Sequence, residues 1–513
     1  MHRFPIYWLA VLMRTATPPS RSDAVGRPFV AVLVGVTLVV SIISSLGAPL
    51  LPDVAKDLDV SLPNAQWSLT AALIAGAIAA PVLGRLGDGR HRRRSILGAL
   101  LVVTAGGVIA GLADSLPLLV VGRVMQGTGL GLAPIAMAAA RDHLGGEHAR
   151  RTIALLSVSG ATGLGAGYPI SGLIAEQLDL HAAFFFGAVL SSAALVAAYL
   201  VIPSNDDGPA VSLDVVGAVV GAVAVVALMI GIGQGHEWGW TSPATIACFV
   251  LAIVVGAAWV LHQLRVPEPL VDLTQLRHRA VLGADVSASL LGIALYMFLT
   301  VITEFVQTPS AEGFGFDAST LVAGLCLVPF SVASLLGSRM MTATLRRFGS
   351  RAALAIGGLA ITAAGVFFAL VHGALWQACV MMALLGIGFG FTFAAIPGLI
   401  TRSVPAREVG SAMGFYQVVR SIGFSAGSAL VASLLASHEI AGSAFPAVGG
   451  YTTALWAGAG IALFATLVAV ALAPREGRAA APATEEELET WRDDAELASA
   501  GLIDGEAEVQ IRR

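Results

Sequence analysis

The chain has 513 residues, of which 56% are hydrophobic and 12% are charged, and its formal net charge is −4. Its mean hydropathy of +0.82 excludes an ordinary water-soluble protein, because long uncharged runs of this kind are insoluble outside lipid. The slightly acidic balance also argues against nucleic acid as a partner.

Apolar runs follow one another along the whole sequence. A helix needs roughly 20 apolar residues to cross a hydrocarbon core of about 30 Å, and backbone groups inside lipid must be satisfied within the segment, which favours helices over strands. We therefore expect an all-α polytopic membrane protein with fourteen transmembrane helices. The predicted spans lie near residues 29–51, 65–83, 95–113, 116–140, 152–175, 181–202, 213–233, 243–264, 280–306, 319–341, 352–371, 375–400, 409–435 and 449–472.

These spans predict a domain plan with two six-helix bundles and two inserted helices between them. The plan comprises an N-terminal tail (1–27), the first bundle (28–202), a polar linker (203–212), two inserted helices (213–264), a loop (265–279), the second bundle (280–472) and an acidic tail (473–513). Within that tail, residues 484–498 fit either a short acidic helix outside the membrane or a disordered segment.

Positive charge falls almost entirely in alternate loops between the spans. These loops hold the arginines 85, 90, 92–94, 141, 150, 151, 265, 277, 279, 346, 347, 351, 402 and 407. The opposite loops hold only Lys56, the sole lysine. By the positive-inside rule the arginine loops and both tails face the cytoplasm. The preference for Arg over Lys is typical of a GC-rich bacterial genome, so we expect a bacterial plasma membrane.

Three cysteines, Cys248, Cys326 and Cys379, lie inside apolar runs. Their number is odd and their spacing is not that of metal ligands, so we interpret them as packed thiols. The sequence predicts no metal site and no cofactor.

The stretch GRLGDGRHRRR (84–94) concentrates charge between two apolar spans. Arginines alone would anchor the topology, but further residues stand at fixed places before them. The stretch resembles the signature between helices 2 and 3 of the major facilitator superfamily, carried here by Gly84, Leu86, Gly87, Asp88, Arg90, Arg92 and Arg93. Gly89 and His91 depart from the pattern, and Arg90 would supply the displaced basic charge. The resemblance implies a gate, in which Asp88 pairs with an arginine and faces a helix N-terminus across the two halves.

LVVGRVMQGTGLG (119–131) resembles the helix-4 pattern of the same family, with Arg123, Gln126, Gly127 and Gly129. An arginine inside an apolar span is costly unless it is paired or faces water, which makes Arg123 a functional candidate. The alternative is an arginine held by backbone carbonyls for structure alone.

GLGAGYPISG (163–172) resembles the helix-5 pattern of the antiporter branches, with Gly163, Gly167, Pro169 and Gly172. The proline is displaced by one residue from the usual Gly-Pro pair. In the family this element is tied to export, although ordinary small-residue packing between helices also fits.

Four further stretches complete the resemblance. Residues 409–430 resemble the penultimate helix, 212–221 and 236–243 resemble the inserted helices, and 345–351 echo the opening loop as an internal repeat would. Together the motifs, in order over residues 28–472, indicate the fourteen-helix drug/proton antiporter branch.

An antiporter needs a membrane-embedded group that takes up and releases a proton, and burial raises the pKa of a carboxyl group toward the working range. The helix-1 aspartate of many relatives falls at Ile43 here, so that site is missing. Glu304 is a replacement, because Tyr296, Thr300 and Glu304 share one helix face at four-residue spacing. The alternative for Glu304 is a carboxylate at the membrane rim.

Asp285 lies nearer the cytoplasmic end of the same span and is either a second coupling acid or an interfacial partner of Arg279. The proton-coupling candidates are therefore Glu304, Asp285 and Arg123. Tyr296, Thr300 and Arg420 are cavity candidates, with Arg420 as a counter-charge.

The resemblance implies a monomeric, proton-coupled exporter of small amphipathic molecules that works by alternating access. The alternatives are a proton-coupled or facilitated metabolite carrier and a non-transporting sensor on the same fold. An ATP-driven pump is disfavoured, because no loop carries the glycine-rich phosphate motif that ends in Gly-Lys-Ser/Thr. No catalytic residue is predicted, and the expected partners are the substrate, protons and the lipid bilayer.

Overall fold

A computed structural model describes residues 21–46, 50–60, 62–144, 146–203, 211–277, 279–405, 408–438 and 446–473. Within these ranges the regular elements are α-helices and short 3₁₀ turns, with no β-strand. Twelve helical segments are long and apolar enough to cross a membrane. The all-helical, membrane-spanning class is thus confirmed for the described part of the chain. The expected tail segment 484–498 lies outside the described residues.

The first half of the protein, residues 21–203, contains eight helices among its described residues. They are α2 (Arg21–Ser45), α3 (Leu51–Asp57), α4 (Leu62–Gly87), α5 (Arg92–Gly111), α6 (Leu116–Gly127), α7 (Leu132–His143), α8 (Gly146–Gln177) and α9 (Leu180–Val201), with a 3₁₀ turn η1 (Thr128–Gly131). A side-chain cap fixes one start: Asp179 accepts a hydrogen bond from the backbone N–H of Ala182 at 2.7 Å.

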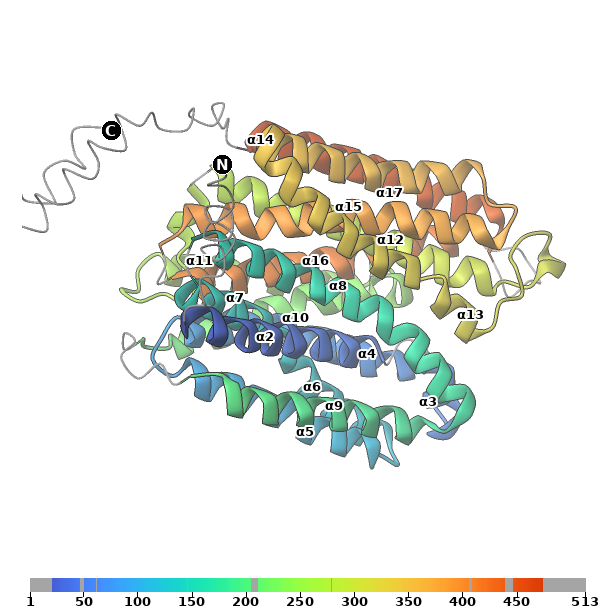
Figure 1. The fold of residues 1–513 in the computed structure, drawn as a ribbon. Helices are drawn as coiled ribbons and strands as arrows, with labels where there is room; N and C mark the ends of the chain where they lie inside the picture. Colours follow the sequence, from blue (N-terminus) through green and yellow to red (C-terminus); the bar gives the residue numbers. More distant parts are fainter. Residues whose placement is uncertain are drawn as a thin grey trace, which may run out of the picture. The chain divides into compact units, whose positions relative to one another are not determined.

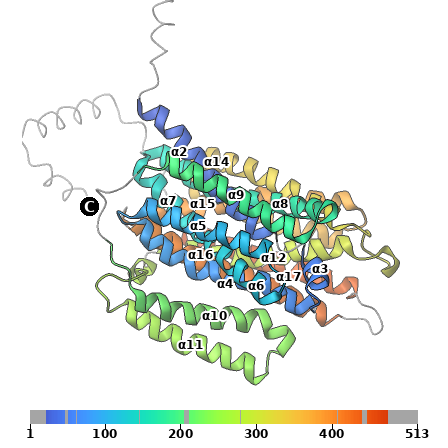
Figure 2. The ribbon, with the colours of Figure 1, turned by 90° about the horizontal axis from the view of Figure 1, so that it is seen from below.

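Two apolar helices, α10 (Val215–Trp238) and α11 (Pro243–Gln263), follow the first half. Asp214 caps α10 through the N–H of Gly217 at 2.8 Å. The turn between the helices passes through Gly239, whose φ of 89° suits a residue without a Cβ atom. Figure 2 shows the two helices side by side along one side of the bundle, with α10 packed against α4 and α16.

The second half, residues 279–473, contains six helices among its described residues. They are α12 (Arg279–Gln307), α13 (Thr320–Leu325), α14 (Val328–Leu370), α15 (Leu375–Ser403), α16 (Val409–Ala436) and α17 (Val448–Leu472), and the 3₁₀ turns are η2 (Leu273–Arg277), before α12, and η3 (Ser310–Glu312). In Figure 1 α12, α14, α15 and α17 lie together, apart from α2, α5, α6 and α9 of the first half.

The helices lie where the apolar runs predicted spans, but several runs are interrupted. The run near 116–140 is broken by η1, and that near 319–341 changes from α13 to α14 just before Pro329, which lacks the N–H that a helix interior needs. α14 carries a turn at Gly349, whose φ of 80° is not helical. This turn coincides with the predicted loop at 345–351.

The same glycine packing occurs once in each half. Gly163 and Gly167 of α8 lie against the backbone of α2, and Gly423 and Gly427 of α16 lie against the backbone of α12. A Cβ atom on Gly163 would lie 2.7 Å from a carbonyl oxygen of α2, and one on Gly427 would overlap a carbonyl of α12. Glycine therefore permits a close helix pair at corresponding places in the two halves.

The cysteines Cys248, Cys326 and Cys379 are free thiols, and the sulfur atoms of Cys326 and Cys379 lie 4.0 Å apart.

Candidate functional site

Asp88 joins the two halves at the end of the helices that carries residues 84–94, here called the arginine end. It follows the last residue of α4, and only 4% of its surface is exposed. Its Oδ1 accepts a hydrogen bond from the N–H of Gly410 at 2.6 Å, and its Oδ2 accepts one from the N–H of Ser411 at 2.8 Å. These N–H groups begin α16 and have no partner within the helix. The carboxylate thus caps the second half from the first, where the helix dipole also favours a negative charge.

Glycines bring α4 and α16 together behind this contact. A Cβ atom on Gly410 would lie 2.7 Å from Oδ1 of Asp88. One on Gly414 would lie 2.7 Å from the carbonyl oxygen of Ala80 and from Cα of Pro81. The capping of α16 therefore depends on the absence of side chains at this interface.

The arginine partner that the resemblance implied for Asp88 is absent among the described residues. Arg92 is buried and instead pairs with Asp142 at 2.5 Å while donating to the carbonyl oxygen of Gly87. Arg85 lies 3.6 Å from Glu268. The backbone N–H groups of α16 thus take the role that an ion pair was expected to fill.

The remaining residues of the 84–94 motif make other contacts around this one. Arg93 donates to the carbonyl oxygen of Tyr199 at 2.8 Å and lies over its ring. Arg90 is exposed and donates to His91. Leu86 is half-buried, and Gly87 packs against Ile135 of α7.

Burial raises the pKa of Asp88 to about 7. The hydrogen bonds from Ser411 and Gly410 and the charges of Arg85 and Arg92 lower the pKa, but they offset the cost of burial only in part. Burial thus outweighs the groups that stabilise the charged form of this carboxyl, and its pKa stays above that of an exposed aspartate.

A further bond ties the halves together at the arginine end: Arg141 of α7 donates to the carbonyl oxygen of Thr401 in α15. The hydroxyl of Ser411 donates to the carbonyl oxygen of Leu270 at 3.0 Å, which fixes the segment that precedes the second half. In this structure the arginine end is closed.

The halves also meet nearer the opposite end, through α8. A Cβ atom on Gly324 of α13 would lie 2.9 Å from the backbone nitrogen of Pro169, so the two backbones are in contact. Ser331 of α14 donates to the carbonyl oxygen of Thr162 at 3.3 Å. Pro169 of the helix-5 motif therefore lies at the contact between halves, whereas Gly163 and Gly167 pack against α2. Gly172 is buried.

A small cavity lies between these contacts, with a volume of about 30 Å³. It is lined from the first half by Thr37, Val40, Ser41, Gly129, Leu130, Leu132, Ala133, Met137, Leu156, Ser157 and Gly160, and from the second by Gln417 and Arg420. This space holds about two water molecules. An organic substrate can therefore enter only after the halves separate at one end.

Arg420 is the charged residue of this cavity. Its guanidinium lies 5.7, 5.4 and 5.5 Å from the ring centres of Phe393, Tyr416 and Phe424. Its Nη2 donates to Oε1 of Gln417 at 2.5 Å, and its Nε has no hydrogen-bond partner. We call Arg420 and these three rings the Arg420 cluster.

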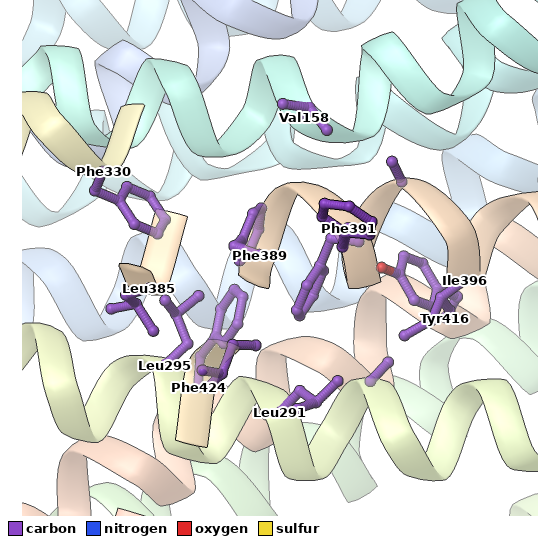
Figure 3. Packing of buried hydrophobic residues seen from close by; sticks show 14 of the residues in the cluster. Val158, Leu291, Leu295, Phe330, Leu385, Phe389, Phe391, Ile396, Tyr416 and Phe424 are labelled. Atoms are coloured by element: carbon purple, nitrogen blue, oxygen red, sulfur yellow. The ribbon is translucent and has the colours of Figure 1, made fainter. Parts of the chain in front are cut away.

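Figure 3 shows the aromatic surroundings of this cluster. Rings of α15 and α16 gather between α8 and α12, among the labelled residues Val158, Leu291, Phe389, Phe391, Tyr416 and Phe424. Phe389 stacks on Phe393 with ring centres 4.1 Å apart, and Tyr296 of α12 stacks on Phe424 at 4.5 Å.

Arg123 lies inside the first half and does not line the cavity. It is 1% exposed, and its Nη1 donates to the carbonyl oxygen of Ile43 at 3.2 Å and to Oε1 of Gln126 at 2.9 Å. It forms no ion pair with any described residue, and its Nη2 has no partner. Backbone carbonyl groups thus accept part of the hydrogen bonds that stabilise the buried Arg123. Of the motif glycines, Gly127 packs against α4 and Gly129 lines the cavity.

The polar face predicted on α12 becomes more exposed along its length. Tyr296 and Thr300 are half-buried, and Glu304 is exposed. Asp285, near the other end of α12, is only 4% exposed, and its Oδ1 has no hydrogen-bond partner. Among the described residues Asp285 forms no ion pair, either with Arg279 or with Arg420. Asp285 and Glu304 lie near opposite ends of α12, so the structure does not bring their two carboxyl groups together.

Gln417 and the hydroxyls of Thr37, Ser41 and Ser157, which line the cavity, are not among the residues predicted from sequence. Gln417 and Arg420 were recognisable as a polar pair one helical turn apart in an apolar helix. The hydroxyls carried no such signal, because Ser and Thr also satisfy themselves on their own helix carbonyls.

Comparison with known proteins identifies the class of fold. The profile described as Major Facilitator Superfamily matches residues 33–428, so the chain belongs to this superfamily. It is 27% identical over 428 residues to the tetracenomycin C resistance and export protein of Streptomyces glaucescens, covering 82% of this chain and 78% of that protein. It is 26% identical to the lincomycin resistance protein of Streptomyces lincolnensis, covering 91% and 95%.

A solved structure of a proton:xylose symporter of the superfamily superposes with a TM-score of 0.62 at 16% identity, covering 92% of this chain and 99% of that one. This likeness shows the fold alone. The chain is a multi-pass membrane protein of the major facilitator class.

Proposed function

We propose that this protein exports small amphipathic molecules, drugs or secreted metabolites, from a bacterial cell in exchange for protons. The observation that carries the proposal is the capping of α16 by Asp88, because this contact joins the halves at one end and can break without unfolding either half. The relatives in Streptomyces are a resistance and export protein and a resistance protein, which supports export as the direction.

Alternating access follows from the closed cavity. The lining residues come from both halves, so separation at the arginine end would open the cavity to one side of the membrane, and separation around α8 and α13 would open it to the other. Breaking the Asp88 contact would expose four polar groups to water, which can satisfy them. The Asp88 contact can therefore hold the halves together and still break at a small cost in free energy.

Proton coupling needs an acid within the spans, and the two candidates differ. Asp285 is buried with one unpartnered oxygen, whereas Glu304 is exposed. Isolated buried charges are costly and persist only when they are paired or neutralised. Asp285 meets this requirement more closely, and Glu304 stays the alternative.

The topology that we propose has fourteen spans. The candidate segment Leu321–Leu370 has 50 residues and turns at Gly349, so it counts as two spans. α8, with 32 residues, is a further span. α10 and α11 are then the inserted pair, and the arginine loops and both tails lie in the cytoplasm of a bacterial plasma membrane.

Inverted membrane vesicles test the proposed exchange. The vesicles are energised by respiration and contain a pH-reporting dye, and a panel of neutral, cationic and anionic drugs is added. Drug addition should dissipate the gradient with the wild type and with Asp114→Asn, which alters an exposed loop acid. Asp285→Asn should abolish the response.

The other outcomes are equally informative. If Glu304→Gln abolishes the drug-induced loss of the pH gradient and Asp285→Asn retains it, Glu304 carries the proton. If no drug dissipates the gradient, while the protein equilibrates a metabolite across proteoliposomes, it is a facilitated carrier and the exchange is wrong.

A further inference from the structure

Arginine side chains line two cavities between the halves. Arg420 lies in the central cavity, and Arg151 and Arg402 line a second cavity at the arginine end. Among the described residues that line these two cavities there is no carboxylate. A lipophilic cation in the central cavity meets the like charge of Arg420, whereas an anion is attracted.

Three aromatic rings beside the central cavity already face a cation, the Arg420 guanidinium. Rings recognise organic cations through their negative faces within about 6 Å. Here Phe393, Tyr416 and Phe424 each lie within that range of the Arg420 guanidinium. The protein's own cation thus fills the place where a cationic drug would be recognised.

The hydrogen bonds of the cavity wall also favour an anionic substrate. The hydroxyls of Thr37, Ser41 and Ser157 donate to the carbonyl oxygens of Leu33, Thr37 and Phe393, so their protons are committed. Gln417 accepts from Arg420 through Oε1, which leaves its NH₂ group as a donor. Arg420 retains an unpartnered Nε–H. The uncommitted N–H groups of this wall, on Gln417 and Arg420, are donors that an anionic oxygen would satisfy, while the hydroxyl oxygens still offer lone pairs as acceptors.

We propose that the substrate is an amphipathic compound bearing an anionic oxygen, such as a carboxylate or phenolate. The oxygen binds Arg420 and the NH₂ group of Gln417, and the apolar part of the molecule lies against Val40, Leu130 and Leu156 of the same cavity. This inference rests on the proposed export function and specifies the substrate class of the same site. It predicts that cationic drugs are poor substrates.

Two dyes with one ring system test the charge. Fluorescein is an anion and rhodamine 123 is a cation, and both share a planar three-ring xanthene. Binding to the purified full-length protein is measured by fluorescence anisotropy. We expect fluorescein to bind at least 10-fold more tightly than rhodamine 123.

Variants of Arg420 then locate the binding. Arg420→Gln should weaken fluorescein binding about 10- to 100-fold, the loss expected for a charge-assisted hydrogen bond. It should also strengthen rhodamine 123 binding, because the rings are freed. Arg420→Lys keeps the charge and should retain part of the affinity. Arg339→Gln, an exposed arginine on α14, is the control for net charge.

Three results would overturn the substrate class: equal binding of both dyes, an unchanged fluorescein affinity in Arg420→Gln, or binding of neither dye. Size-exclusion profiles of the variants show whether each is folded. The vesicle assay with the drug panel uses neither dye, so it separately decides whether the protein exchanges drugs for protons.

Discussion

Gly84 of α4 and Gly410 of α16 approach so closely that a Cβ atom added to either would overlap the other's carbonyl group. The two residues belong to different halves and lie 326 positions apart in the sequence. Their contact sets the distance at which Asp88 reaches the first N–H groups of α16. The closed arginine end is therefore specified by missing side chains as much as by the carboxylate.

Gly410→Ala should shift the protein toward the form that is open at the arginine end. The added methyl group meets backbone, which cannot turn aside, and overpacking of this kind costs about 1–3 kcal/mol. This would change the ratio of open to closed forms about 5- to 150-fold. Spin labels on Arg94→Cys and Arg347→Cys, in a background without native cysteines, should report a longer distance. Gly98→Ala is the control, because a Cβ atom there meets nothing within 4 Å, and equal distances in both variants would contradict the role of the contact.

Acidification should favour the closed arginine end. Burial raises the pKa of Asp88 to about 7 in the closed form, and exposure to water on opening returns it toward about 3.9. The closed form thus binds the proton more tightly, so its stability relative to the open form increases as the pH falls through 7 and levels off below about 4. The same spin labels measured between pH 8 and pH 5 should show the closed distance gaining population.

Asp88→Asn is the matched control for this pH dependence, because its side chain does not titrate in this range. The population shift between pH 8 and pH 5 should disappear in the variant. A shift of equal size in Asp88→Asn would assign the pH dependence to another group.

Ile43→Asp should be tolerated although the position is only 1% exposed. Arg123 Nη2 and Gln126 Nε2 have no partners. The Ile43 side chain and Gln126 Nε2 lie 3.5 and 3.6 Å from the place of a Cβ atom on Gly187, so they face the same spot. A carboxylate there would gain the ion pair that Arg123 lacks.

Thermal unfolding in detergent measures this compensation. Leu100→Asp, also fully buried, should cost roughly 3–5 kcal/mol as an unpaired buried charge. Ile43→Asp should cost at least about 2 kcal/mol less. Equal losses in the two variants would show that Arg123 is satisfied by the carbonyl oxygens of Ile43 and Ser68 and by Gln126.

The positions of the helices were predictable from sequence because lipid imposes a simple requirement, a long apolar run with internal hydrogen bonds. The interruptions inside an apolar run could not be predicted from sequence. The predicted span 116–140 changes from α6 to the 3₁₀ turn η1 and then to α7. Apolar residues lie on both sides of this break, so the apolar run alone does not locate it.

The site was predictable only in part, since its contacts join distant segments. The motif in the sequence identifies Asp88 as a site residue. Whether its carboxylate pairs with an arginine or with the first N–H groups of a helix depends on the packing of α4 against α16. For Arg420 the sequence indicates a charge inside an apolar helix. It does not indicate that Phe393, on another helix, lies over that charge.

Gly167→Ala should destabilise the protein, and Ser45→Ala should rescue part of the loss. A Cβ atom on Gly167 would overlap the Ser45 hydroxyl and lie 3.0 Å from the carbonyl oxygen of Ile42. Overpacking should cost about 1–3 kcal/mol. Ser45→Ala alone removes a hydrogen bond to Ile42 of 2.8 Å, worth about 1 kcal/mol. Because the two residues touch, the double variant should be more stable than the sum of single effects predicts, by at least about 0.5 kcal/mol. Thermal unfolding of the wild type, the two single variants and the double variant in one detergent measures this coupling. Strictly additive effects would contradict the contact between Gly167 of α8 and Ser45 of α2.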